Sequence, residues 1–202
     1  MRFPLAIIAV LSVASCSRST GDAQEASPQH EVLATPSAQV QAPTEVSFTR
    51  SAPVDESFTG EAAGFMQMHA QPAAADLIEA SSEAVRNEAR LAGCRPSPAE
   101  NQVFSVDLDE DGRNEGLAIY NIACNGGRNP TRILAVLRQD EQLHWKPVLQ
   151  RAISVTPGAK RPIIELRSGE IILAGEQAPD GERMPPETIE IPATGQETEA
   201  VP

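Results

Sequence analysis

The feature that most constrains the fold is an acidic turn between two apolar stretches, within residues 104–120. The flanking stretches, 102–108 and 116–123, are rich in the aliphatic and aromatic residues that favour strands. The turn between them is rich in Asp, Asn and Gly, which are typical of tight connections. This pattern predicts a β-hairpin on which the rest of the domain packs.

The carboxylates of this turn are spaced like the ligands of a hard cation. Asp107, Asp109, Asp111 and Glu115 fall at positions 1, 3, 5 and 9 of the loop, and the backbone carbonyl of Arg113 falls at position 7. Ca²⁺ prefers about six to eight oxygen ligands, and one flexible loop with this spacing supplies several of them. We therefore predict a Ca²⁺ site of low affinity. The alternative is an Asp- and Gly-rich turn that holds no metal.

The loop resembles the Asp-x-Asp-x-Asp-Gly-x-x-Asp/Glu hairpin loops of integrin-type propeller blades and related extracellular β-proteins. It is not an EF-hand, because Ala118 stands at position 12, where an EF-hand has a bidentate glutamate. A propeller needs several blades, and the sequence contains one copy of this loop. The resemblance therefore implies the local loop and its cation, and not the propeller.

The N-terminus has the pattern of a bacterial export signal. Residues 1–15 combine Arg2 with an apolar run at 5–13 that is too short for a permanent membrane span. The following Val13-Ala14-Ser15-Cys16 resembles the lipobox of bacterial lipoproteins. That resemblance implies cleavage before Cys16, acylation of Cys16 with palmitate among its chains, and anchoring in a membrane of the cell envelope. The alternative is an ordinary cleaved signal peptide.

The residue after the acylated cysteine bears on which membrane holds the protein. Ser17 stands there, and in the enterobacterial sorting pattern a residue other than Asp implies the outer membrane, with the protein facing the periplasm. Residues 16–71 are rich in Ser, Thr, Pro, Ala, Gln and Glu, so we expect a disordered tether in which Phe48, Phe58 and Phe65 are isolated. Residues 72–192 are predicted to fold, and 193–202 to form a disordered tail.

The folded part is predicted to be α+β, mainly β. An apolar stripe at helical spacing predicts one helix over 72–92, ended by Gly93 and Pro96. Short apolar runs joined by turn residues then predict an antiparallel meander or small sandwich of about six strands. The continuous apolar run at 132–138 is typical of a central strand, and Pro147 places the next strand at an edge. A hairpin around Ser168 and a short strand at 188–191 complete the domain.

The cysteines agree with an extracytoplasmic address. If Cys16 is acylated, Cys94 and Cys124 remain, an even number in an oxidising compartment. We expect them to form a disulfide, and the alternative is two free buried thiols. A zinc site is not expected from this pair, because structural zinc needs four ligands.

Residues 101–175 resemble a loosely defined group of small bacterial envelope proteins. The likeness rests on the acidic hairpin, the Leu134–Leu137 strand, Trp145 and the Gly169–Leu173 strand. The group is largely uncharacterised, so the resemblance implies fold and location. The formal net charge of −12 argues against a nucleic-acid partner.

Three functions are compatible with these observations. The first is a membrane-anchored envelope lipoprotein with a calcium-binding loop and a non-catalytic structural or partner-binding role, the partner being an envelope protein or peptidoglycan. The second is a module that binds a sugar or peptidoglycan fragment near Trp145 and Tyr120. The third is a hydrolase. We expect no enzyme, because the serine-hydrolase, zinc-protease, phosphate-loop and dinucleotide motifs are missing and His144 is expected to be a surface residue.

Overall fold

The computed structural model describes residues 45–49, 54–124, 130–154, 160–177 and 180–193. The predicted signal peptide, the lipobox with Cys16, most of the tether and nearly all of the C-terminal tail lie outside these residues. Among the described residues, no helix combines the length and the apolar composition that a membrane crossing would require.

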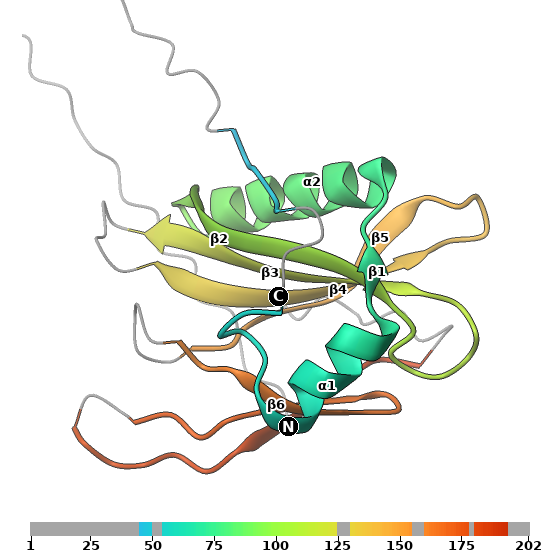
Figure 1. Ribbon diagram of the computed structural model, residues 1–202. Helices are drawn as coiled ribbons and strands as arrows, with labels where there is room; N and C mark the ends of the chain where they lie inside the picture. Colours follow the sequence, from blue (N-terminus) through green and yellow to red (C-terminus); the bar gives the residue numbers. More distant parts are fainter. Residues whose placement is uncertain (1–44, 50–53, 125–129, 155–159, 178–179, 194–202) are drawn as a thin grey trace, which may run out of the picture. The chain divides into compact units, whose positions relative to one another are not determined.

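The described chain contains two helices and two antiparallel sheets (Figure 1). The helices are α1 (Gly60–His69) and α2 (Ala75–Leu91). The first sheet has the order β1-β2-β3-β4-β5, and the second has the order β6-β7-β8. The strands of the first sheet are β1 (Gln71–Pro72), β2 (Cys94–Val106), β3 (Glu115–Cys124), β4 (Thr131–Gln139) and β5 (Trp145–Ala152), and those of the second are β6 (Ile163–Arg167), β7 (Glu170–Leu173) and β8 (Glu187–Glu190).

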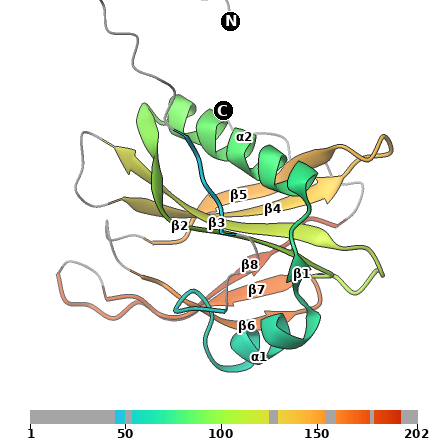
Figure 2. The same ribbon diagram turned by 45° about the horizontal axis from the view of Figure 1, so that its top comes forward.

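Both faces of the five-stranded sheet are buried. Strand alternation explains why, because successive side chains point to opposite faces. In β3, Leu117 and Ile119 enter a core shared with α1 and the second sheet, whereas Ala118 and Tyr120 enter a core shared with α2. Figure 2 shows α2 on one face of this sheet, with α1 and the second sheet on the other. The acidic turn joins β2 to β3, so it lies at one end of the five-stranded sheet.

The predicted fold class is confirmed. The domain is mainly β and antiparallel, and β2 to β5 form a meander in which β4 is central and β5, which carries Pro147, lies at the edge. The hairpin around Ser168 is β6-β7, and the last predicted strand is β8. The predicted helix is α2, which begins at Ala75 rather than at residue 72.

The predicted disulfide is also confirmed. Cys94 and Cys124 are directly opposite each other on β2 and β3 and are joined by a disulfide. The bond connects the first residue of β2, just after α2, to the last residue of β3, so it holds the start of β2 in register with β3.

The predicted tether extends too far toward the C-terminus. Of the residues expected to be isolated, Phe58 is buried beside the second sheet, Phe48 is buried beside α2, and Phe65 is partly buried against the same core as Phe58. Met66, in the same segment, is also buried beside the second sheet. Phe58 packs edge to face against Phe104 of β2, with ring centroids 5.3 Å apart. The composition of residues 60–69 gave no sign that they pack in the core. Two glycines reduce the helix propensity of residues 60–69, and its few apolar residues gain burial only from tertiary contacts.

This correction predicts a specific loss of stability. Met66 is 1% exposed and Met68 is 76% exposed on the same helix, so Met66→Ala and Met68→Ala form a matched pair. Met66→Ala should lower the free energy of unfolding by about 2–5 kcal/mol, because it removes a buried side chain and leaves a cavity. Met68→Ala should change it by less than about 0.5 kcal/mol. Urea unfolding followed by circular dichroism measures both changes in the free energy of unfolding. Equal changes in the two variants would mean that residues 60–69 do not pack on the domain and belong to the tether.

Candidate functional site

The acidic loop between β2 and β3 is folded by its own carboxylates. The backbone N–H of Gly112 donates to Asp107 Oδ2 at 3.0 Å, and that of Arg113 donates to Asp111 Oδ1 at 2.8 Å. Gly112 has a φ of +86°, a conformation that glycine adopts without strain. Asp side chains of the turn thus act as local acceptors for its backbone N–H groups.

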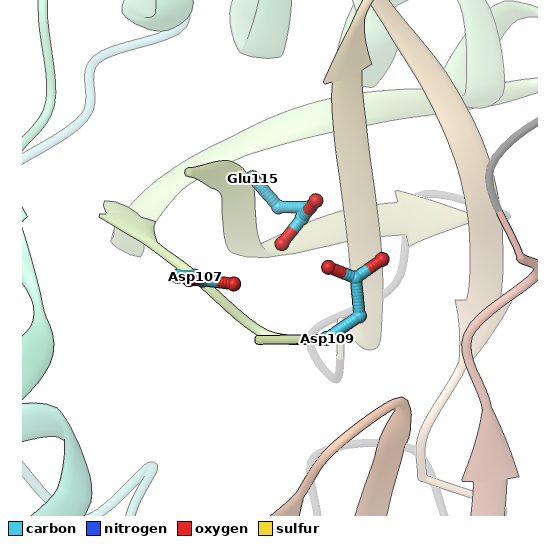
Figure 3. A group of neighbouring side chains, drawn as sticks. All are labelled: Asp107, Asp109 and Glu115. Carbon is cyan, nitrogen blue, oxygen red and sulfur yellow. The ribbon is translucent and has the colours of Figure 1, made fainter. Parts of the chain in front are cut away.

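Three of the predicted ligands converge. One carboxylate oxygen from each of Asp107, Asp109 and Glu115 lies within 4.8 Å of the others. Figure 3 shows the three side chains directed toward a common space, from the residue after β2, the loop and the first residue of β3. Carboxylate oxygens are hard donors of the kind that Ca²⁺ prefers. This group could hold a metal ion.

Asp111 and Arg113 are not part of this group. Asp111 is exposed, and one of its carboxylate oxygens accepts the N–H of Arg113. The alternating sequence positions of Asp107, Asp109 and Asp111 therefore do not give three equivalent side chains. The third converging carboxylate comes from Glu115, which reaches back from the first residue of β3.

A guanidinium that the sequence analysis did not single out lies against the same carboxylates. Arg138, in β4, places Nη2 2.5 Å from Asp109 Oδ2 and Nε 3.2 Å from Glu115 Oε1. Its Nη1 donates to the backbone carbonyl of Pro192, just after β8. The contact depends on the register of the sheet and on the second sheet. The signal for it in the sequence is weak, namely an arginine directly after the apolar run 133–137 of β4.

Glu115 is the most buried member of the group. Its side chain is 3% exposed, and Oε2 accepts the backbone N–H of Leu108 at 2.8 Å. Burial raises the pKa of the Glu115 carboxyl above its usual value, and the nearby charge of Asp109 acts in the same direction. The hydrogen bond from Leu108 and the contact with Arg138 oppose this shift. Burial outweighs them.

Asp107 is only partly satisfied. Its Oδ2 accepts the N–H of Gly112, whereas its Oδ1 is buried and has no hydrogen-bond partner among the described residues. A buried carboxylate oxygen without a partner is costly, because it has lost water and gained nothing. An additional positive group beside Asp107 would remove this cost.

The loop also contacts the second sheet. Ser168, in the β6–β7 turn, donates its hydroxyl to the carbonyl of Asp109 at 3.0 Å, and the N–H of Gly169 donates to the carbonyl of Leu108 at 3.0 Å. Together with the bond from Arg138 to Pro192, these contacts place the acidic loop at a junction between the two sheets. A structural change in the loop would therefore alter contacts with both sheets.

The two aromatic residues considered as a ligand platform are in different environments. Tyr120 is fully buried under α2, where its hydroxyl accepts a hydrogen bond from Gln150 Nε2 at 2.9 Å, and burial raises its pKa. It does not line a site, which corrects the expectation that it stands beside Trp145. Trp145 does line an open groove beside the acidic loop. His144 is exposed, as predicted.

Comparison with known proteins leaves the site to be interpreted from its own geometry. No family model, no curated protein and no solved structure matches this chain at a significant level.

Proposed function

We propose that the protein is a lipid-anchored lipoprotein of the bacterial envelope. Its folded domain would bind a divalent cation, Ca²⁺, in the acidic loop and serve a non-catalytic structural or partner-binding role. The observation that carries the cation proposal is the convergence of Asp107, Asp109 and Glu115. The ion would be held by these three carboxylates, with remaining ligands from loop carbonyls, including the predicted one of Arg113, and from water.

Charge balance supports a divalent ion in addition to the arginine. The three converging carboxylates carry three negative charges, and Arg138 supplies one positive charge. Two negative charges remain in a partly buried space, where their mutual repulsion is poorly screened. A divalent cation would offset both, and the unpartnered Oδ1 of Asp107 is an available ligand.

The position of the loop suggests what the ion would do. The loop contacts the β6–β7 turn through Ser168, and Arg138 connects it to the segment after β8. An ion there would therefore stiffen the junction between the sheets. Weak Ca²⁺ sites, with a Kd of roughly 0.1–1 mM, are typical of extracellular modules, and the periplasm is likewise a compartment outside the cytoplasm.

A catalytic role is less well supported by the same carboxylates. General acid–base catalysis needs a side chain within reach of the substrate proton. Glu115 is nearly inaccessible, and both it and Asp109 are held by Arg138. The exposed His144 lies outside this group, so the three converging carboxylates are not accompanied by the histidine that the hydrolase hypothesis considered.

The anchor proposal rests on the sequence alone. Residues 13–16 match the lipobox pattern, and several acyl chains on Cys16 would hold the protein firmly, since a single chain binds a bilayer only marginally. The outer membrane, with the domain in the periplasm, is the proposed location.

The cation proposal predicts a stability change with metal. In the full chain, Ca²⁺ at about ten times its Kd should stabilise the fold by about 1.4 kcal/mol and raise Tm by roughly 3–8 °C. Asp107→Asn should abolish the rise, because it removes one charged ligand while its amide oxygen can still accept the N–H of Gly112. Glu110→Gln, an exposed change in the same loop, is the control and should keep the rise. Differential scanning calorimetry in EDTA and in Ca²⁺ measures Tm. An unchanged Tm of the unmutated chain on addition of Ca²⁺ contradicts the proposal.

Arg138 gives a second and independent prediction. Arg138→Gln removes the guanidinium from a pair whose side chains are 11% and 3% exposed, so it should cost about 3–5 kcal/mol in EDTA. Because three uncompensated carboxylates then remain, Ca²⁺ should stabilise this variant more than the unmutated chain. Arg113→Gln, exposed in the same loop, should leave stability in EDTA unchanged. If Ca²⁺ restores none of the free energy of unfolding that Arg138→Gln loses, the carboxylates bind the arginine and do not bind an ion.

The anchor is tested by metabolic labelling. Cells expressing the chain and fed radiolabelled palmitate should incorporate label into it and retain it in the membrane fraction. Cys16→Ala should lose the label and release the protein from membranes, because it removes the residue that would carry the acyl chains. Ser17→Ala keeps the cysteine and should keep the label. Absence of label in the unmutated protein would leave an ordinary cleaved signal peptide.

A further inference from the structure

A groove of about 800 Å³ lies between the acidic loop and the β4–β5 turn, at one end of the five-stranded sheet. Its size is within the range of small-molecule sites. Four neutral polar side chains and one aromatic side chain line it, namely Gln71, Ser105, Asn114, Gln139 and Trp145. They come from β1, β2, the residue before β3, β4 and β5.

The register of the sheet places these side chains on one face. Gln71 is opposite Ser105, Ser105 is opposite Gly116, and Gln139 is opposite Trp145. A Cβ added to Gly116 would meet Leu77 of α2, so this is the face that α2 covers. Because side chains alternate, Asn114 follows the same face as Gly116. The five residues therefore continue the face of the sheet beyond the start of α2, where that helix no longer covers it.

The polar side chains of this groove are uncommitted. Gln71, Ser105, Asn114 and Gln139 form no side-chain hydrogen bond to any other residue that the structure describes. Three amides and a hydroxyl offer donors and acceptors in comparable numbers. Such a mixture pairs with hydroxyl groups, each of which is also both a donor and an acceptor.

The side chain of Trp145 forms one side of the groove and is restrained by its contacts with α2. Its Nε1 donates to Asp76 Oδ2, in the first turn of α2, at 3.0 Å, and its ring packs against the core under that helix. The indole N–H is thus already satisfied, so the part of the ring that faces the groove offers apolar surface. A ligand that suits it needs a flat C–H face as well as hydroxyl groups.

The charges around the groove disfavour a strongly charged ligand. Glu115 is paired with Arg138, and Asp140 is paired with Lys146 at 2.9 Å. The remaining charged side chains that line it are Asp111, Glu141 and Arg113, which leave one net negative charge among the lining residues. Asp107 and Asp109 of the acidic loop do not line the groove but add negative charge beside it, so an anion would be repelled. This excess negative charge lies on the acidic-loop side, where the cation proposed above would offset it, and the five residues of the groove wall are themselves neutral.

We propose that this groove binds a neutral oligosaccharide, with a pyranose ring stacked on Trp145 and its hydroxyl groups hydrogen-bonded to the amides of Asn114 and Gln139. A sugar ring has an apolar C–H face and equatorial hydroxyl groups that donate and accept, which matches both features of the groove. The proposal goes beyond the cation site and the anchor, because neither Asp107 nor Cys16 takes part in the recognition.

Trp145 makes the test direct, because it is the only tryptophan in the chain. The full chain carrying Cys16→Ser, which is not acylated, is titrated with triacetylchitotriose, cellotriose and maltotriose while tryptophan emission is recorded. At least one of these neutral sugars should give a saturable change. The double variant Asn114→Ala/Gln139→Ala should weaken binding by about tenfold, because it removes both amides that would hydrogen-bond to the sugar. Gln142→Ala, an exposed amide outside the groove lining, should bind as before.

The outcomes separate this proposal from the others. No saturable change with any of the three sugars overturns it, as does equal weakening by the double variant and by Gln142→Ala. A response to spermidine or to trigalacturonate without one to the neutral sugars assigns the groove to a charged ligand and also overturns it. Repeating the titration in EDTA and in Ca²⁺ shows whether binding needs the ion. A chain that binds sugar without responding to Ca²⁺ refutes the cation site alone.

Discussion

The fold depends on the need to cover both faces of one sheet. Strands β3 and β4 alternate apolar residues on both sides, so neither face can be left in water. Helix α2 covers one face, and α1 with the second sheet covers the other. This requirement explains why a segment with a poor helical pattern, residues 60–69, is ordered against the domain. Met66 and Ala62 complete a core that the β-strands alone would leave open.

Covering the second face creates the junction at which the acidic loop lies. The second sheet must meet the end of the β2–β3 hairpin, and Arg138 bridges them by donating to Asp109, Glu115 and the carbonyl of Pro192. All three guanidinium nitrogens are thereby used. A buried arginine with so many partners is stabilising only while each partner stays in place. The loop carboxylates thus have a structural role before any ion is considered.

The elements of the central sheet could be predicted from the sequence because their patterns are local. The apolar run of β4, the proline of β5 and the turn residues at Asp107–Gly112 and Ser168 each identify one element. The disulfide could be predicted by counting cysteines in a chain whose N-terminus predicts export. The limits of the domain could not be predicted, since the burial of Phe48 and Phe58 depends on partners more than fifty residues away in sequence, such as Asn101, which bonds to Ser47, and Ile163, which pairs with Phe58.

The site was predictable only in part for the same reason. Loop spacing identified Asp107, Asp109 and Glu115, but it also included Asp111, whose side chain faces solvent because it accepts a local N–H. It could not identify Arg138, whose position depends on strand register. Nor could it separate Tyr120 from Trp145, since only the alternation of β3 and the path of α2 decide that one is buried and the other lines a groove.

Asn114 and Glu115 connect the proposed cation site with the proposed sugar site, because they are neighbours in one hairpin. Successive residues at the start of β3 alternate between the faces of the sheet, so the Glu115 carboxylate contacts Arg138 while Asn114 follows the face that α2 covers, and both residues border the groove. An ion bound to Glu115 would restrict the backbone of the residue before it. Because ordering a polar side chain before a ligand arrives lowers the entropic cost of binding, such an ion would strengthen sugar binding without contacting the sugar. The coupling would be reciprocal, so a bound oligosaccharide would raise the affinity of the loop for the ion by the same factor.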